Sequence, residues 1–192
     1  ESYIGHHWCN YWMHVMHLNT TSGKMSKSKG EFLTVSLLEQ KGYDPLAYRL
    51  FCLQSHYRKN LVFSWENLDN AMGTYQKLIA KIAALKPSDE PIDEDAVTAL
   101  REKFNKALGN DLNTSLGITA LYDVLKYQTN DATKLYLLDD FDKVLSLDLL
   151  KKAEEARKKA ASAKGSGGEY NIVSESGEQD AAVEAKIRAR FE

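Results

Sequence analysis

Three lysines lie close together in the segment Gly23-Lys24-Met25-Ser26-Lys27-Ser28-Lys29-Gly30, where small hydroxyl side chains separate them and a glycine stands at each end. Ammonium groups at this spacing repel one another unless an anion neutralises them. A mobile cationic loop of this composition therefore favours a bound polyphosphate over an empty site. A solvated basic turn is the alternative interpretation of such a lysine-rich segment.

The residues on either side of this loop predict the elements that must position it. An apolar, aromatic run from Asn10 to Leu18 has strand character and leads into the loop. After the loop, Thr34 precedes apolar helix formers as a capping hydroxyl, and Gly42 is expected to end that helix. Asp44 is the expected N-cap of the next helix, with Pro45 in its first turn.

The motifs around the loop resemble those of the cysteinyl-tRNA synthetases, a family of class I aminoacyl-tRNA synthetases. The loop contains KMSKS, the signature that closes over ATP in that class, and a YWMH segment precedes it. The run from Asp44 to Arg58 is similar to the family pattern D-P-x-x-x-R-x-x-x-L-x-x-H-Y-R, Leu61–Ser64 to L-N-F-S, and Asp111–Thr114 to D-L-N-T. The resemblance covers roughly residues 8–125.

The resemblance implies a role for each polar residue of the loop. Lys27, the second lysine of the motif, would contact the ATP phosphates and neutralise charge that grows on the departing pyrophosphate. Lys24 would assist as a second catalytic cation, and the hydroxyls of Ser26 and Ser28 would donate hydrogen bonds to the phosphates. Glu31 departs from the family pattern, which has asparagine there, and it adds a carboxylate near the expected phosphates.

Arg58 and Lys59 are the candidate tRNA contacts. The family-typical His56-Tyr57-Arg58 would support the acceptor end of tRNA through phosphate contacts. A buried polar junction between the loop region and the following helices is the alternative. Asp111 and Asn113 indicate helix capping rather than catalysis.

The function implied by the resemblance is that of a cysteine–tRNA ligase, which activates cysteine with ATP and transfers it to tRNA(Cys). Two alternatives stay open: a ligase that joins cysteine to an amino sugar in thiol-cofactor biosynthesis, and a non-catalytic helical RNA-binding module. No βαβ units and no H-I-G-H-type motif precede the loop, so we expect a fragment of a longer parent that is inactive alone. The resemblance also implies a zinc ion in the parent, with ligands that lie upstream of the matching region and so outside this chain. His6, His7 and Cys9 are themselves too tightly spaced for a usual four-ligand zinc site.

The expected fold class is mainly α: the end of a Rossmann-like catalytic domain with the KMSKS loop, followed by an antiparallel helical bundle. Amphipathic helices joined by short polar segments favour such a bundle. The expected divisions are a catalytic edge with the loop (1–31), a helical connective region like a stem-contact fold (32–64), the bundle (65–160), a flexible linker (161–180) and the start of an anticodon-binding domain (181–192).

Composition limits the remaining possibilities. The chain has 192 residues, 43% of them hydrophobic, and a net charge of −2, so RNA contacts must come from local patches rather than from a global basic field. No apolar run approaches the ~20 residues that span a membrane. Two cysteines, Cys9 and Cys52, provide no disulfide framework, so we expect a cytoplasmic protein. We also expect a monomer.

Overall fold

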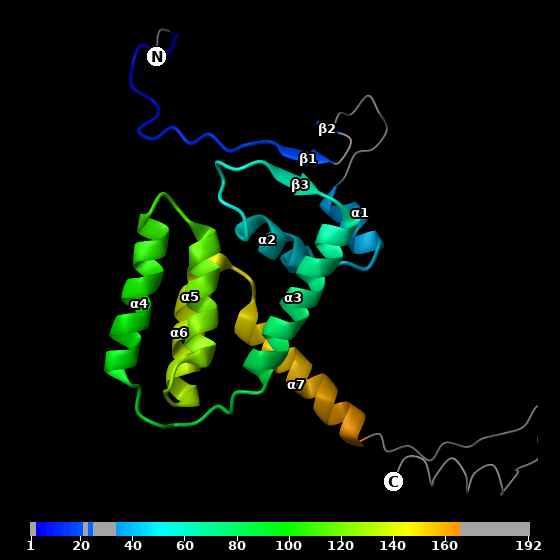
Figure 1. Ribbon diagram of the computed structural model, residues 1–192, viewed down its shortest axis with the longest axis vertical. Helices are drawn as coiled ribbons and strands as arrows, with labels where there is room; N and C mark the ends of the chain where they lie inside the picture. Colours follow the sequence, from blue (N-terminus) through cyan, green and yellow to red (C-terminus); the bar gives the residue numbers. More distant parts are fainter. Residues whose placement is uncertain (1–2, 21–22, 25–33, 166–192) are drawn as a thin grey trace, which may run out of the picture. The chain divides into compact units, whose positions relative to one another are not determined.

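The computed structural model describes residues 3–20, 23–24 and 34–165, and this part of the chain is mainly helical, as predicted (Figure 1). The chain divides into two compact units, residues 1–157 and 158–192. The first unit holds all the elements described below except the C-terminal end of the last helix. None of the helices in the described ranges is long and apolar enough to cross a membrane.

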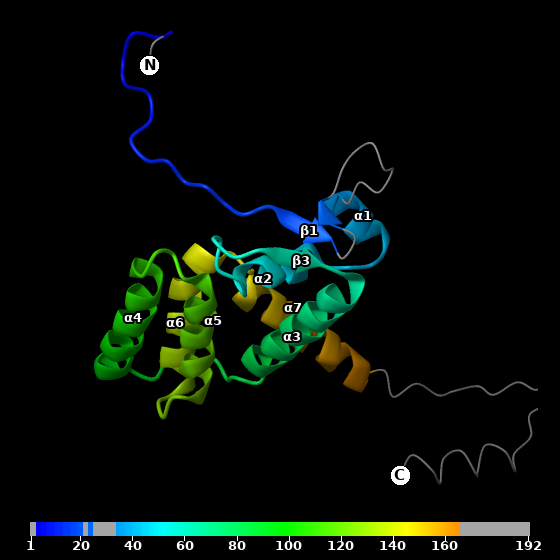
Figure 2. The ribbon, with the colours of Figure 1, turned by 45° about the horizontal axis from the view of Figure 1, so that its top comes forward.

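Three short strands form a small sheet. In the chain, one strand precedes the lysine loop (residues 23–30), one is the start of that loop and one follows it. Strand β1 (Leu18–Thr20) lies in the centre, antiparallel to β2 (Gly23–Lys24) and parallel to β3 (Leu61–Phe63). Figure 2 shows β1 and β3 side by side. The strand expected from Asn10 onward is shorter than predicted. Residues 11–17 form no helix or strand, and β1 begins at Leu18.

Helix α1 (Val35–Gln40) begins and ends where the sequence predicts. The Thr34 hydroxyl accepts the Leu37 N–H at 3.2 Å. At the other end Gly42 has φ of +84° and the two reversed hydrogen bonds of a Schellman motif close the helix. A side chain is disfavoured at this backbone conformation, which explains why glycine stands there.

Helix α2 (Pro45–Leu53) also has its predicted N-terminus. The Asp44 carboxylate accepts the Leu46 N–H at 2.9 Å, and the missing N–H of Pro45 is harmless in the first turn.

Five longer helices follow. At the start of each of the first four, a polar side chain accepts a backbone N–H of the first turn. They are α3 (Trp65–Ala83), α4 (Glu94–Gly109), α5 (Thr114–Lys126), α6 (Asp131–Leu145) and α7 (Leu149–Gly165). The caps of the first four are Ser64, Asp93, Asn113 and Asn130. The Asn113 cap confirms a prediction made from the sequence.

The main hydrophobic core is formed by buried residues of α3, α4, α5, α6 and α7, and α4, α5 and α6 run side by side (Figures 1 and 2). Phe104 and Phe141 stack there with ring centroids 4.0 Å apart. Helix α3 packs along α2 and also contributes buried residues to this core, so the four helices expected to form the bundle share one core. The core also includes Ala47 and Leu50 of α2, and it therefore extends across the predicted boundary at residue 64.

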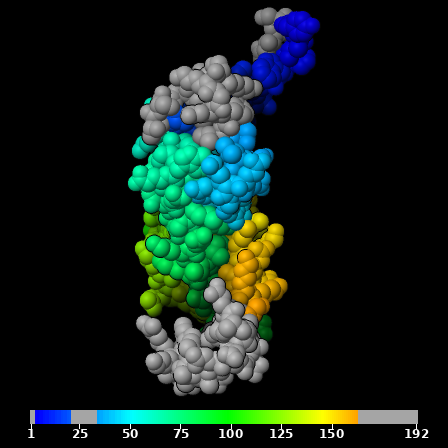
Figure 3. All heavy atoms as spheres, turned by 90° about the vertical axis from the view of Figure 1, so that its right-hand side faces the viewer, coloured from blue at the N-terminus to red at the C-terminus, as the bar shows by residue number. Residues whose placement is uncertain are grey.

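A second, smaller core joins the sheet to the first helices. Its buried members come from α1, α2, β3 and α3: Leu38, Phe51, Phe63, Leu68 and Ala71. In Figure 3 the segments around α1 (light blue) and α3 (turquoise to green) adjoin one another. This core fixes the elements on both sides of the lysine loop.

Candidate functional site

The structure anchors both ends of the lysine loop. Lys24 lies in β2, where it pairs in register with Asn19 of β1, and Thr34 begins α1 on the other side. Ser26, Lys27 and Ser28 lie outside the described residues, so their predicted roles stay predictions.

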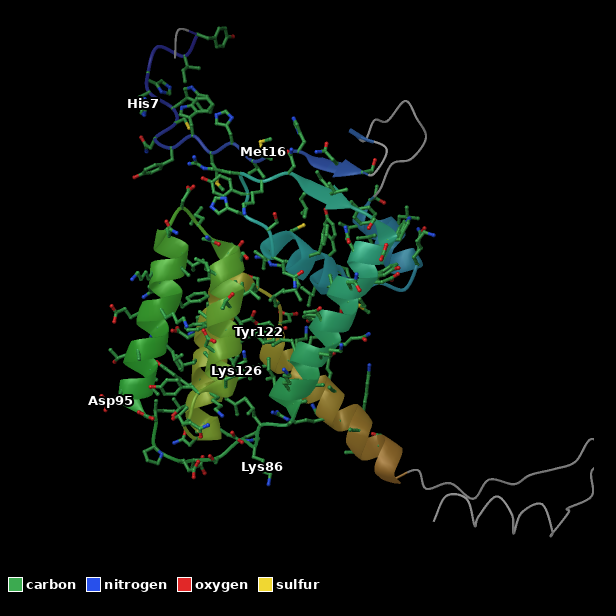
Figure 4. All side chains as sticks on the ribbon, viewed as in Figure 1. His7, Met16, Lys86, Asp95, Tyr122 and Lys126 are labelled. Carbon is green, nitrogen blue, oxygen red and sulfur yellow. The ribbon has the colours of Figure 1, made fainter. Side chains whose placement is uncertain are left out.

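The two candidate RNA contacts lie together in the connection between α2 and β3. Arg58 and Lys59 are both exposed there. The N-terminal segment is tied to this connection, since the Met16 N–H donates to the Tyr57 carbonyl at 2.9 Å, and Figure 4 shows where Met16 lies.

A charged cluster forms where this connection meets the turn between α4 and α5. The Tyr57 hydroxyl donates to Asp111 Oδ1 at 2.6 Å, and Arg58 Nε lies 2.9 Å from Asp111 Oδ2. The same Arg58 Nε is 2.9 Å from the Tyr57 hydroxyl oxygen, so its N–H is shared between two acceptors. His56 Nε2 lies 3.7 Å from the carboxylate, and its ring stacks on Tyr57.

These contacts shift the ionisation of two members of the cluster. The Tyr57 hydrogen bond, followed by the charges of Arg58 and His56, lowers the pKa of Asp111. The hydrogen bond with Tyr57 and the charge of Asp111 raise the pKa of Arg58. The carboxylate and the guanidinium therefore remain an ion pair at neutral pH. The side chains of Asp111 and Arg58 are 44% and 67% exposed, so solvent screens the ion pair. The pair therefore contributes little to the free energy of folding and mainly orients the two side chains.

The position of Asp111 corrects one prediction. Asn113 caps α5 by accepting the Leu116 N–H at 3.1 Å, as expected, but Asp111 does not cap a helix. It stands in the left-handed region with φ of 56°, which turns its carboxylate toward Tyr57 and Arg58 instead. Sequence reasoning missed this role because the partners are more than 50 residues apart. In the segment His56-Tyr57-Arg58, the first two residues are half-buried and Arg58 is exposed.

A hollow of about 420 Å³ lies beside this cluster, and aromatic and sulfur-containing side chains line most of it. The lining residues are Trp12, Met13, His14, Met16, Tyr57 and Arg58. One guanidinium beside several exposed rings is a combination that suits a planar anionic ligand.

No metal site is assigned to the described ranges. Within them, no group of three or more His, Cys, Asp or Glu side chains is placed to hold an ion. Cys9 and His6 each contact a nearby backbone carbonyl instead. These residues therefore do not fit a zinc site.

Comparison with known proteins identifies the family. Residues 1–73 match the family described as the catalytic domain of class I (C) tRNA synthetases. A cysteine–tRNA ligase of Novosphingobium aromaticivorans is 44% identical over 143 residues, which cover 72% of this chain and 29% of that protein. The chain belongs to the cysteine–tRNA ligase family. The resemblance inferred from KMSKS and its flanking motifs is thus confirmed.

Further relatives agree with this membership. The cysteine–tRNA ligase of Methylococcus capsulatus is 35% identical over an alignment of 199 residues, which covers 100% of this chain and 40% of that protein. That of Thermococcus gammatolerans is 35% identical over 136 residues, covering 65% of this chain and 28% of the relative. The chain thus spans between 28% and 40% of the length of these curated relatives.

Proposed function

We propose that this chain is the part of a cysteine–tRNA ligase that carries the KMSKS loop and the helices behind it. The whole enzyme activates cysteine with ATP and transfers the cysteinyl group to tRNA(Cys). The observation that carries this proposal is the family match over residues 1–73, which includes the complete loop. Anchors on both sides of the loop, in β2 and at Thr34, support it.

In this proposal the loop binds the ATP phosphates through Lys24 and Lys27, with Ser26 and Ser28 as hydroxyl donors. The lysines neutralise charge that develops on pyrophosphate as the cysteine carboxylate attacks the α-phosphorus. A donor aimed at such charge contributes about 2.7–4 kcal/mol to transition-state stabilisation. Movement of the loop over ATP would then be a gating step.

Arg58 and Lys59 are proposed to contact the phosphates of tRNA near its acceptor end. Arg58 is partly neutralised by Asp111, and the adjacent exposed Lys59 restores a net positive charge to this connection. Local charge of this kind compensates for a chain whose net charge is −2.

Other features of the expected enzyme are also proposals. They are a Rossmann-like edge in residues 1–31, the linker and anticodon-binding segment of residues 166–192, zinc held by ligands elsewhere in the parent, a monomeric state and a cytoplasmic location. Residues 161–165 belong to helix α7 and not to a linker, which corrects the predicted start of the linker, and residues 166–192 lie outside the described residues.

The test is charging of tRNA by the full-length parent with labelled cysteine. Serine in place of cysteine and an amino sugar in place of tRNA serve as controls. We expect label on tRNA that depends on cysteine. Transfer to the amino sugar but not to tRNA would replace this proposal with the amino-sugar ligase, and no activation of cysteine would leave only a binding module.

A further inference from the structure

We propose that Lys152 and Arg49 are positioning residues for the activation of cysteine. They hold helix α2, and the corner between α1 and α2 (residues 41–44), against the turn between α6 and α7 (residues 145–148). The lysine loop comes shortly before α1 in the chain, so the placement of this corner sets the placement of the loop's lysines. The inference rests on the proposed function, to which it adds two residues outside the loop.

The α6–α7 turn has an unusual backbone. Ser146 and Asp148 have φ of 52° and 50°, in the left-handed region that non-glycine residues rarely adopt. The side chain of Leu147, between them, is fully buried. Residues keep such a backbone where surrounding contacts hold it, and they are concentrated where function needs a fixed geometry. The contacts of this turn therefore indicate what it serves.

Two helices of the bundle fix the turn. The Asp142 carboxylate of α6 accepts the N–H groups of Leu147 and Leu149 at 2.6 and 2.8 Å. The hydroxyl of Tyr75, on α3, donates to the Leu147 carbonyl at 2.7 Å in a buried hydrogen bond. Since both carboxylate oxygens and a buried hydroxyl hold one short segment, the turn is a rigid support.

Two cationic side chains join α2 to this support. The Lys152 ammonium lies 2.7 Å from Asp44 Oδ2 at the start of α2, and the Lys152 N–H donates to the Asp148 carbonyl at 2.9 Å. Arg49 Nε, further along α2, donates to the Leu145 carbonyl at 2.6 Å, where a positive charge is favourable at the C-terminal end of α6. The two contacts therefore hold α2 against the support at two separate points.

The α1–α2 corner connects this support to the lysine loop. The Tyr43 N–H donates to the Leu38 carbonyl at 3.0 Å, which joins the corner to α1. Leu38 and Phe51 also share the smaller core, so α1 and α2 pack together. Thr34 then begins α1, whose six residues separate it from the corner. A shift at the corner is carried by this short helix to the loop, where a displacement of about 1 Å can cost about 100-fold in rate.

The first experiment measures cysteine-dependent pyrophosphate exchange by the full-length parent. Lys152→Met should lower turnover about 10- to 100-fold with little change in the KM for cysteine, because misplaced loop lysines lose contacts that form in the transition state. Arg49→Met should act in the same direction. Lys152→Arg keeps the cation and should retain most of the turnover.

Lys143→Met is the matched control for this experiment. Lys143 is 65% exposed and pairs with Asp139 and Asp140 of its own helix, so its loss removes one lysine charge without touching α2. We expect turnover close to that of the wild type.

The second experiment measures amide hydrogen exchange in the 192-residue chain, which needs no enzymatic activity. Lys152→Met should speed exchange of the Tyr43 and Leu46 amides about 5- to 30-fold relative to the Phe104 amide of α4. A loss of stability throughout the chain would instead speed all three amides together.

The outcomes separate this inference from the proposed function. Wild-type turnover in a folded Lys152→Met parent, or equal losses in the Lys152 and Lys143 variants, would overturn the positioning role alone. Unchanged exchange of the Tyr43 and Leu46 amides would overturn the support of the corner by the turn. A wild-type parent without pyrophosphate exchange would refute the proposed function, whatever the amides show.

Discussion

Replacement of Asp44 tests how one carboxylate can hold two distant parts of the chain. Its Oδ1 accepts the Leu46 N–H at 2.9 Å and caps α2, while Oδ2 lies 2.7 Å from the ammonium of Lys152 on α7. The two charged side chains are only 22% and 29% exposed. The ion pair is therefore less screened than a surface pair.

The magnitude follows from these two contacts. Loss of an N-cap costs about 1 kcal/mol. Removal of one partner of an ion pair costs up to about 1 kcal/mol at the surface and about 3–5 kcal/mol when the pair is buried, so about 1–2 kcal/mol suits a pair with this exposure. We expect Asp44→Ala to lower the free energy of unfolding by about 2–3 kcal/mol. Asp44→Asn keeps a capping oxygen and should lose only about 1–2 kcal/mol.

The effect should also depend on pH. Burial opposes ionisation of Asp44, but the hydrogen bonds from Lys152 and the Leu46 N–H and the Lys152 charge outweigh it and lower its pKa. Since the folded state holds the proton more weakly, the stabilisation is present above the ordinary aspartate pKa of about 3.9 and is lost as pH falls through the lowered value. The hydrogen bond to Asp44 raises the pKa of Lys152, so the contribution should persist until the pH rises through that raised value.

Urea unfolding of the wild-type chain and both variants, at neutral pH and at acidic pH, measures these differences. The double variant with Lys152→Met completes a mutant cycle that isolates the ion pair. The reasoning would be refuted if Asp44→Asn destabilised the chain as much as Asp44→Ala. A difference from wild type that persists unchanged when Asp44 is protonated would equally contradict it.

Three further predictions concern the loop, the core and two glycines. In the full-length parent, Lys27→Ala should lower turnover in pyrophosphate exchange about 10²–10³-fold while the KM for cysteine changes little; unchanged turnover would refute the assignment. Phe141→Ala removes a side chain that is 1% exposed and stacked on Phe104, so urea unfolding should show a loss of about 3–5 kcal/mol, and a loss under 1 kcal/mol would contradict the packing. Gly73→Ala, where a Cβ meets nothing within 4 Å inside α3, should stabilise the chain by about 0.5–1 kcal/mol, whereas Gly42→Ala, at φ +84°, should destabilise it by about 1–2 kcal/mol. Thermal unfolding of the two glycine variants should move in opposite directions, and shifts of the same sign would show that backbone conformation does not decide them.

The sequence alone determined most helix boundaries. Ser64, Asp93 and Asn113 each cap a helix by accepting an N–H three residues later, and that bond needs no distant partner. Gly42 and Pro45 act through their own backbone conformations in the same way. The KMSKS motif likewise identified the family from contiguous residues, because its chemistry resides in side chains a few positions apart.

Only the tertiary structure decided how distant segments meet. The composition of the aromatic run before the loop predicts a strand, but a strand also needs a partner, and within the described residues β3 pairs in register with Leu18–Thr20 alone. Asp111 resembles a cap by residue type, yet its left-handed backbone directs the carboxylate to Tyr57 and Arg58 more than 50 residues earlier. A hydrogen bond within one helical turn depends only on residues that are adjacent in sequence. A contact between residues far apart in sequence depends on how every element between them packs.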